Sequence, residues 1–126
     1  KMIDETRKIL HEPDMKVTAT CVRVPVFYGH SESVNIEFEK PATPEQVRAV
    51  LEKAPGLIVI DDPANHGYPT ALECADKDEV FVGRIRRDFT VDSGVNMWIV
   101  ADNIRKGAAT NAVQIAQLLI GRTCAR

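Results

Sequence analysis

The sequence predicts an α+β fold in which a mainly antiparallel mixed sheet carries helices packed on one face. Segments with apolar residues at helical spacing occur near the start, in the middle and at the end of the chain. Segments in which apolar and polar residues alternate lie between them. The connections between these segments are too short for many helical crossovers, so most neighbouring strands are expected to run antiparallel.

Length and composition favour one globular domain over residues 1–126, because 44% of the residues are apolar and can form a core. Sixteen basic and eighteen acidic residues give a net charge of -2, and no basic cluster of nucleic-acid-binding size occurs. No apolar run approaches the ~20 residues that cross a bilayer, and the start lacks the apolar core of a signal peptide. We therefore expect a cytoplasmic protein that binds neither nucleic acid nor membranes.

The cysteines do not predict a disulfide framework or a metal site. Cys21, Cys74 and Cys124 are odd in number and far apart, with no Cys-x-x-Cys pair and no histidine at metal spacing. The pair Asp61-Asp62 lacks further ligands at coordinating spacing and is typical of a turn. No metal is expected.

The first predicted elements are a short helix and two strands. Ile3, Arg7 and Leu10 share one face at helical spacing, which predicts a short helix that ends near Pro13. β-Branched residues alternate through residues 16–24, which predicts a strand that carries Cys21 and Arg23 on one face. Residues 34–38 alternate in the same way and predict a half-exposed strand.

A strong helix start follows. Thr43 as N-cap, a proline at the first helical position and Gln46 form a capping box, and the helix is expected to run to about Ala54. Residues 57–60 predict a short buried strand, and the proline, asparagine and glycine content of residues 63–69 predicts a loop.

The last part of the chain is expected to complete a five-stranded sheet and to end in a helix. Residues 70–74 predict a short edge strand or an extended segment, and residues 80–87 and 95–101 predict clear strands. Small apolar residues recur over residues 105–120, with Gly121 as C-cap. This helix should lie against a large flat partner, either this sheet or a domain outside the chain.

Arg23 and His30 carry the strongest functional signal. A planar guanidinium binds a carboxylate through two parallel hydrogen bonds, and an imidazole titrates near neutral pH. Together they suit a site that holds and protonates an anionic substrate. A nucleophile and a cofactor cradle are not found in the sequence, which makes the chain look like part of a larger enzyme.

Six stretches resemble, in sequence and in order, the C-terminal catalytic and dimerisation domain of aspartate-semialdehyde dehydrogenase: residues 20–31, 54–56, 61–63, 68–70, 82–86 and 100–109. The resemblance covers nearly the whole chain. It implies a sheet similar to that of the C-terminal domain of glyceraldehyde-3-phosphate dehydrogenase-like enzymes. It also implies a homodimer, which could pair further into a homotetramer.

The resemblance implies an NADPH-dependent reductive dephosphorylation of β-aspartyl phosphate to aspartate semialdehyde, in the biosynthesis of lysine, threonine and methionine. In that family an N-terminal dinucleotide-binding domain supplies the phosphate loop and the catalytic cysteine, and it binds most of the NADP. Neither feature is found here, so the resemblance implies a fragment that is inactive alone and whose C-terminal helix could pack on the missing domain. The preference for NADP over NAD stays open.

Four site residues follow from the resemblance. His30 matches the acid/base histidine, and Arg23 matches the arginine that binds the substrate α-carboxylate. Lys1 resembles the lysine that contacts the substrate phosphate. Asn103 resembles a position that contacts the nicotinamide end of the cofactor.

Two other functions remain open from the sequence. One is the related reductase of N-acetyl-glutamyl phosphate, against which the Arg23-to-His30 run argues. The other is a dimerisation module without catalysis.

Several tempting residues have simpler interpretations. Cys21 is expected to be a small buried hydrophobe rather than the nucleophile. His11 and His66 are expected to be exposed bystanders, and Arg84 and Arg86 to lie on a solvated or interface-lining strand face.

Overall fold

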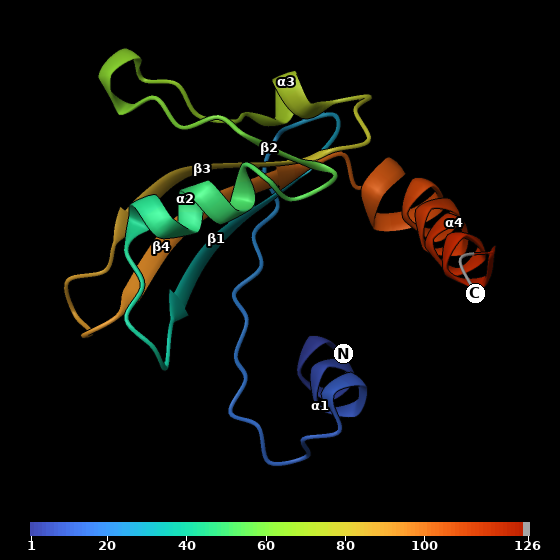
Figure 1. Ribbon diagram of the computed structural model, residues 1–126, viewed down its shortest axis with the longest axis horizontal. Helices are drawn as coiled ribbons and strands as arrows, with labels where there is room; N and C mark the ends of the chain where they lie inside the picture. Colours follow the sequence, from blue (N-terminus) through green and yellow to red (C-terminus); the bar gives the residue numbers. More distant parts are fainter. Residues whose placement is uncertain (125–126) are drawn as a thin grey trace.

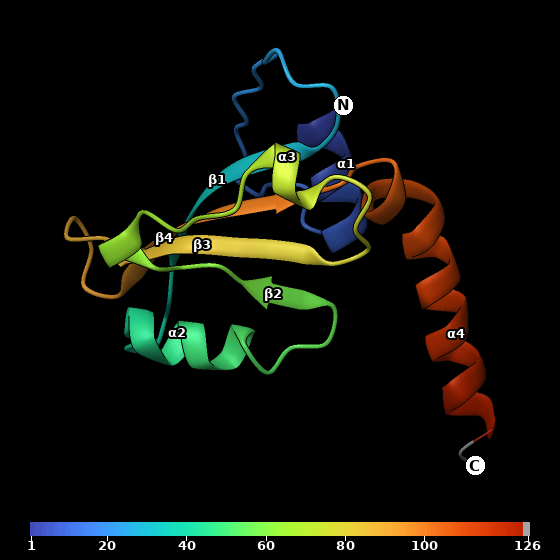
Figure 2. The same ribbon diagram turned by 90° about the horizontal axis from the view of Figure 1, so that it is seen from above.

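A four-stranded mixed sheet forms the centre of the computed structural model, which describes residues 1–124, with side chains up to residue 121 (Figures 1 and 2). The strand order is β1-β4-β3-β2; β4 runs antiparallel to both neighbours, and β2 runs parallel to β3. The predicted α+β class with a mainly antiparallel mixed sheet is confirmed. The strands are β1 His30–Glu37, β2 Leu57–Val59, β3 Val80–Arg87 and β4 Gly94–Ala101.

Short helical segments connect and flank the strands. They are α1 Met2–Leu10, α2 Pro44–Leu51, the 3₁₀ turn η1 Pro63–Asn65, α3 Ala71–Cys74, the π-helical turn η2 Arg105–Ala109 and α4 Thr110–Cys124. The predicted capping box at the start of α2 is present: the Thr43 hydroxyl accepts from the Gln46 amide, and the Gln46 side chain accepts from the Thr43 amide.

The alternation of β3 and β4 gives the sheet two apolar faces. Val82 and Met97 belong to a cluster that Val47 and Leu51 of α2 help to cover. On the opposite face Cys74 of α3 packs into a second cluster, whose other members are Phe81, Val100, Ile60 and Trp98. The expected one-sided helix layer therefore needs a correction, because the short helix α3 covers the second face.

The predicted strand over residues 16–24 is wrong, and the described sheet has four strands instead of five. The segment runs as irregular chain away from the sheet toward α1 (Figure 1). β-Branched residues favour extended backbone, but a strand also needs a neighbour for its backbone hydrogen bonds, and β1 pairs only with β4. Val22 is consequently 78% exposed.

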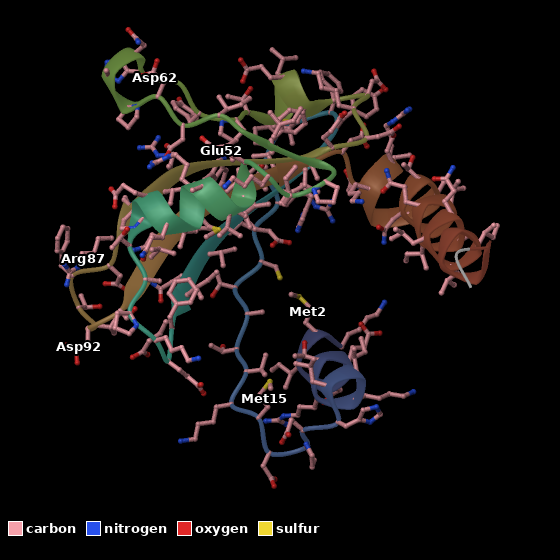
Figure 3. The ribbon with its side chains drawn as sticks, in the orientation of Figure 1. Met2, Met15, Glu52, Asp62, Arg87 and Asp92 are labelled. Atoms are coloured by element: carbon pink, nitrogen blue, oxygen red, sulfur yellow. The ribbon has the colours of Figure 1, made fainter. Side chains whose placement is uncertain are left out.

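Cys21 is exposed, so its predicted burial is also wrong. Its Sγ lies 3.5 Å from the Sδ of Met2 at the start of α1. Figure 3 shows Met2 beside the irregular segment that links α1 to the sheet. The burial prediction failed for the same reason as the strand prediction, because the segment lies on no sheet face.

Two further corrections concern helices. Residues 70–74 form neither an edge strand nor an extended segment, because Thr70 caps α3 and exchanges hydrogen bonds with Glu73 in a second capping box. Gly121 does not end the last helix, since α4 continues to Cys124. A kink at Ala108 lies within η2, two residues before α4 begins.

α1 stands away from the sheet in Figure 1, and α4 does so in both ribbon views (Figures 1 and 2). Their apolar side chains are exposed, among them Ile9 at 72% and Leu118 at 64%. Of the two partners expected for the last helix, this sheet is therefore excluded. Within residues 1–124 no helix combines the length and the apolar character needed to cross a membrane.

Candidate active site

The backbone of His30 is held firmly at the start of β1. His30 pairs with Ala101 of β4. The preceding residue, Gly29, has φ +97, and a Cβ at this position would lie 3.2 Å from the Cβ of Ala71 in α3. Both the left-handed backbone and the crowding favour glycine here. The sequence therefore fixes where the His30 side chain leaves the sheet.

The imidazole itself is open to solvent. The His30 side chain is 66% exposed, and its Nε2 lies 2.9 Å from Oε1 of Glu32. The two residues are two apart on one strand, so their side chains share a face of the sheet. A carboxylate beside one ring nitrogen orients the imidazole, and the exposure leaves it able to exchange protons with a bound substrate.

Asn103 is the predicted site residue that the structure brings to His30. It follows β4, and its Oδ1 accepts a hydrogen bond from the Gly29 amide at 3.2 Å. In the part of the chain that the structure describes, its Nδ2 has no protein partner. A free amide donor fits a carboxamide such as that of a nicotinamide ring, so the position is compatible with NADP.

Arg23 and Lys1 are not brought to His30 by contacts in this chain. Arg23 lies in the exposed irregular segment, and no hydrogen bond or ion pair within residues 1–124 holds its guanidinium. Lys1 precedes α1, and its Nζ lies 3.8 Å from Oε1 of Glu5. Their convergence on His30 stays a prediction.

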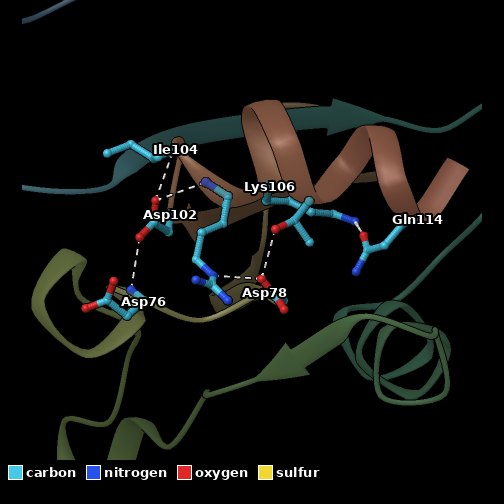
Figure 4. A network of polar contacts seen from close by, with 8 residues as sticks. Asp76, Asp78, Asp102, Ile104, Lys106 and Gln114 are labelled. Atoms are coloured by element: carbon cyan, nitrogen blue, oxygen red, sulfur yellow. Dashed lines mark hydrogen bonds and ion pairs between the residues drawn. The ribbon is translucent and has the colours of Figure 1, made fainter.

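Asp102 is a buried residue of this region that the sequence analysis did not single out. Its side chain is buried, with the residue 2% exposed, and it accepts hydrogen bonds from the amides of Asp76 at 2.9 Å, Ile104 at 2.9 Å and Arg105 at 3.3 Å (Figure 4). The Asp76 amide contributes most to holding the pKa of this carboxyl below its ordinary value, and the Ile104 and Arg105 amides act in the same direction. An aspartate directly after a strand and three residues before a helical turn is a local signal for such a cap.

An ion pair supports the same turn from outside. Arg105 Nε donates to Oδ1 of Asp78 at 2.7 Å, and the Thr110 hydroxyl donates to the same oxygen at 3.1 Å (Figure 4). The Arg105 hydrogen bond lowers the pKa of the Asp78 carboxyl. These contacts connect η2 and α4 to the loop before β3.

The acidic and basic pairs noted in the sequence lie elsewhere. Asp62 caps η1 as the predicted turn requires, while Asp61 is buried against Arg48 and accepts from the Ile85 amide at 3.3 Å. A bulge interrupts β3, where Arg84 has φ 53 and stacks on the Tyr68 ring at 4.9 Å. His66 is exposed, as expected.

The family model of the semialdehyde dehydrogenase dimerisation domain matches residues 1–106. The chain belongs to this family. One curated relative of this chain is the aspartate-semialdehyde dehydrogenase of Aquifex aeolicus, which is 62% identical over 120 residues. The aligned residues make up 95% of this chain and 35% of the relative. The protein of the same name from Legionella pneumophila is 58% identical over 120 residues. The aligned residues make up 94% of this chain and 35% of that relative. The chain thus spans about a third of the length of these relatives.

Solved structures support the same membership. Aspartate semialdehyde dehydrogenase II from Vibrio cholerae, complexed with ASA, aligns with a TM-score of 0.82 and 50% identity over 94% of this chain and 35% of its own. The enzyme from Candida albicans, solved with NADP, aligns with a TM-score of 0.67 and 31% identity over 86% of this chain and 34% of its own. The resemblance inferred from the sequence motifs is confirmed.

Proposed function

We propose that this chain is the C-terminal catalytic and dimerisation portion of an aspartate-semialdehyde dehydrogenase. In this proposal the whole enzyme converts β-aspartyl phosphate to aspartate semialdehyde and phosphate with NADPH, as a cytoplasmic homodimer in amino-acid biosynthesis. The match of residues 1–106 to the family, with relatives of this name up to 62% identical, carries the proposal.

His30 is the proposed acid/base group. It would take the proton of a thiol supplied by the remainder of the enzyme, so that the thiolate attacks the acyl carbon and the bond to the phosphate oxygen breaks. NADPH, when bound, supplies the hydride that reduces the resulting thioester. His30 then returns its proton as the carbon–sulfur bond breaks and the aldehyde leaves. The exposure of its imidazole and the fixed backbone under it suit this exchange.

The remaining residues would orient the substrate and the cofactor. Arg23 would clamp the α-carboxylate through two parallel hydrogen bonds, and Lys1 would stabilise the departing phosphate. The exposure of both side chains leaves them available to a ligand. The free Nδ2 of Asn103 would donate to the nicotinamide carboxamide. Placing the thioester in line with the nicotinamide is the chief contribution of such contacts.

The alternatives have less support. A reductase of N-acetyl-glutamyl phosphate is not favoured, because the relatives from Aquifex aeolicus, Legionella pneumophila and Vibrio cholerae are aspartate-semialdehyde dehydrogenases. A dimerisation module without catalysis would give His30 and Asn103 no function. It would also leave unexplained why the Asn103 side chain binds the turn that precedes His30.

A hybrid enzyme tests the proposal. The matched C-terminal segment of the Aquifex aeolicus relative is replaced by this chain, and NADP reduction is followed with aspartate semialdehyde in the presence and absence of phosphate. We expect phosphate-dependent turnover. A hybrid that folds but is inactive would favour the purely structural module. Turnover with N-acetyl-glutamate semialdehyde in place of aspartate semialdehyde would favour the related reductase.

A further inference from the structure

Asp102 is a buried carboxylate for which the proposed reaction has no chemical task. It is 2% exposed. It lies one residue beyond Ala101, the ladder partner of His30, and one residue before Asn103. A carboxylate kept out of water needs hydrogen-bond donors, and Asp102 obtains three from backbone amides.

These three amides come from two segments. Ile104 and Arg105 belong to the turn that carries Asn103, so their hydrogen bonds to Oδ1 fix the shape of that turn. The third amide, that of Asp76, follows α3 and donates to Oδ2 at 2.9 Å. Asp102 therefore ties the end of β4 to the segment that follows α3 (Figure 4).

The Asn103 turn and α3 both lie against Gly29, the residue before His30. The Asn103 side chain accepts from the Gly29 amide at 3.2 Å. On the α3 side, a Cβ on Gly29 would lie 3.2 Å from Ala71 Cβ and 3.6 Å from the Ala101 carbonyl oxygen. The Gly29 turn is thus enclosed by β4, by the Asn103 turn and by α3, which Asp102 holds together.

We propose that Asp102 and Asn103 are positioning residues for His30, an inference that rests on the proposed function. Asp102 fixes the turn that aims Asn103, and Oδ1 of Asn103 holds the Gly29 amide, so that the imidazole leaves β1 in one direction. This role uses the oxygen of the Asn103 side chain, whereas the proposed contact with the nicotinamide uses its nitrogen. The two roles are therefore separable by substitution.

The test compares Asn103→Ala with Asn103→Asp in the hybrid enzyme. Alanine removes the acceptor, and we expect kcat to fall about 10- to 100-fold, because small displacements of a catalytic group are costly. Aspartate keeps an oxygen for the Gly29 amide but lacks the NH₂ group, so its kcat should be at least about threefold higher than that of Asn103→Ala, while the KM for NADP rises in both variants. The matched control is Asn65→Ala, which removes an amide from the distant η1 turn and should leave kcat unchanged.

The outcomes against the proposal are equally definite. If kcat falls as far in Asn103→Asp as in Asn103→Ala, the nitrogen is the important atom and the positioning role is wrong. If Asn103→Ala raises the KM for NADP while kcat stays at the parent value, Asn103 is a cofactor contact alone.

A second measurement needs no activity and uses the 126-residue chain. The hydrogen exchange of the Gly29 amide is followed by NMR in the parent, in Asn103→Ala, in Asn103→Asp and in Asp102→Asn. We expect at least 10-fold faster exchange in Asn103→Ala and in Asp102→Asn, and near-parent exchange in Asn103→Asp. Unchanged exchange in Asn103→Ala would overturn the proposal. An inactive parent hybrid would refute the proposed function, and Gly29 exchange would still decide this inference.

Discussion

His30 combines a fixed backbone with a free side chain. The β1–β4 ladder and the Gly29 turn fix its Cα, while two thirds of the side chain (66%) remains accessible to a ligand. A general acid or base needs this combination, because its geometry must be set before the substrate arrives and its proton must still be exchangeable. The neighbouring Glu32 oxygen, 2.9 Å from Nε2, selects one orientation of the ring.

Replacing His30 by asparagine tests the acid/base role. We expect kcat of the hybrid enzyme to fall by about 10²- to 10⁴-fold, because general acid–base catalysis typically contributes this much, while the KM for aspartate semialdehyde changes little. Steady-state kinetics with saturating NADP and phosphate measure both constants. His66→Asn is the matched control, since His66 is exposed in a distant turn with φ 56, which asparagine also tolerates. A kcat for His30→Asn within threefold of the parent would remove His30 from the chemistry.

The four residues of the proposed site differ in how far the sequence determines them. β1 begins at His30, where β4 ends, because His30 pairs with Ala101. This register brings His30 close to Asn103, which follows β4. Arg23 lies outside the strands and helices of the described residues, in a segment that does not pair with the sheet. Asp102 was missed because its importance comes from the Asp76 amide, 26 positions away, and spacing does not reveal such a contact.

At the scale of elements, β3 depends on the close approach of its neighbours. Gly83 faces the Ile60 carbonyl and the Pro69 ring, and a Cβ at this position would lie 2.6 Å from Pro69 Cδ and closer still to the carbonyl oxygen. The backbone at Ile60 and the ring of Pro69 pass so close to Gly83 that no side chain fits at this position. The β3 bulge begins at the same residue.

Gly83→Ala should therefore destabilise the fold by about 3 kcal/mol or more, since backbone must move to relieve the overlap. Urea unfolding followed by circular dichroism of the 126-residue chain measures this free energy. Gly121→Ala is the matched control: no atom lies within 4 Å of a Cβ there, and the position is inside α4. Alanine at Gly121 should not destabilise, because it is the better helix former by about 1 kcal/mol. Equal unfolding free energies for the parent and Gly83→Ala would show that β3 and its neighbours shift without cost.

Elements with local signals were the ones that the sequence predicted well. The Thr43–Gln46 box and the alternation of residues 80–87 and 95–101 each lie within one segment, and these elements are present. The equivalent Thr70–Glu73 box was overlooked because the helix that it starts has only four residues. The strand predicted over residues 16–24 failed for a different reason: strand propensity lies within a segment, but the hydrogen-bond partner must come from another.

At the scale of the whole molecule, a group of acidic side chains makes stability depend on pH. The pKa of Asp102 is lowered chiefly by the Asp76 amide, and the pKa of Asp78 chiefly by the Arg105 hydrogen bond. Similar hydrogen bonds lower the pKa values of three further carboxyls, Glu45, Asp62 and Asp88. The folded chain therefore binds fewer protons than the unfolded chain in the acid range.

The contribution of these carboxyls to the free energy of unfolding should be complete between about pH 5 and pH 7 and should be lost as the pH drops below about 4, where the unfolded carboxyls take up protons first. Thermal unfolding between pH 7 and pH 2.5 measures this dependence as a falling Tm. Asp102→Asn removes one of these groups, so its Tm should start lower at pH 7 and depend less steeply on pH. A Tm of the parent that stays constant or rises from pH 5 to pH 3 would contradict this account.

Large apolar side chains are exposed on several elements of the described chain. Phe27 is 100% exposed, Leu72 89% and Phe89 87%. Together with membership in a dimerisation-domain family, this exposure leads us to expect that the chain associates in solution.

Light scattering after size exclusion should give a mass of about 28 kDa, twice the 14.0 kDa of one chain. The dimer should persist at high salt, because apolar burial, unlike contacts between exposed charges, is not screened by ions. A mass of one chain at every concentration between about 10 and 100 μM would show that the exposed apolar residues do not bind a second copy, and their partner would then have to be sought in the remaining two thirds of the relatives' length.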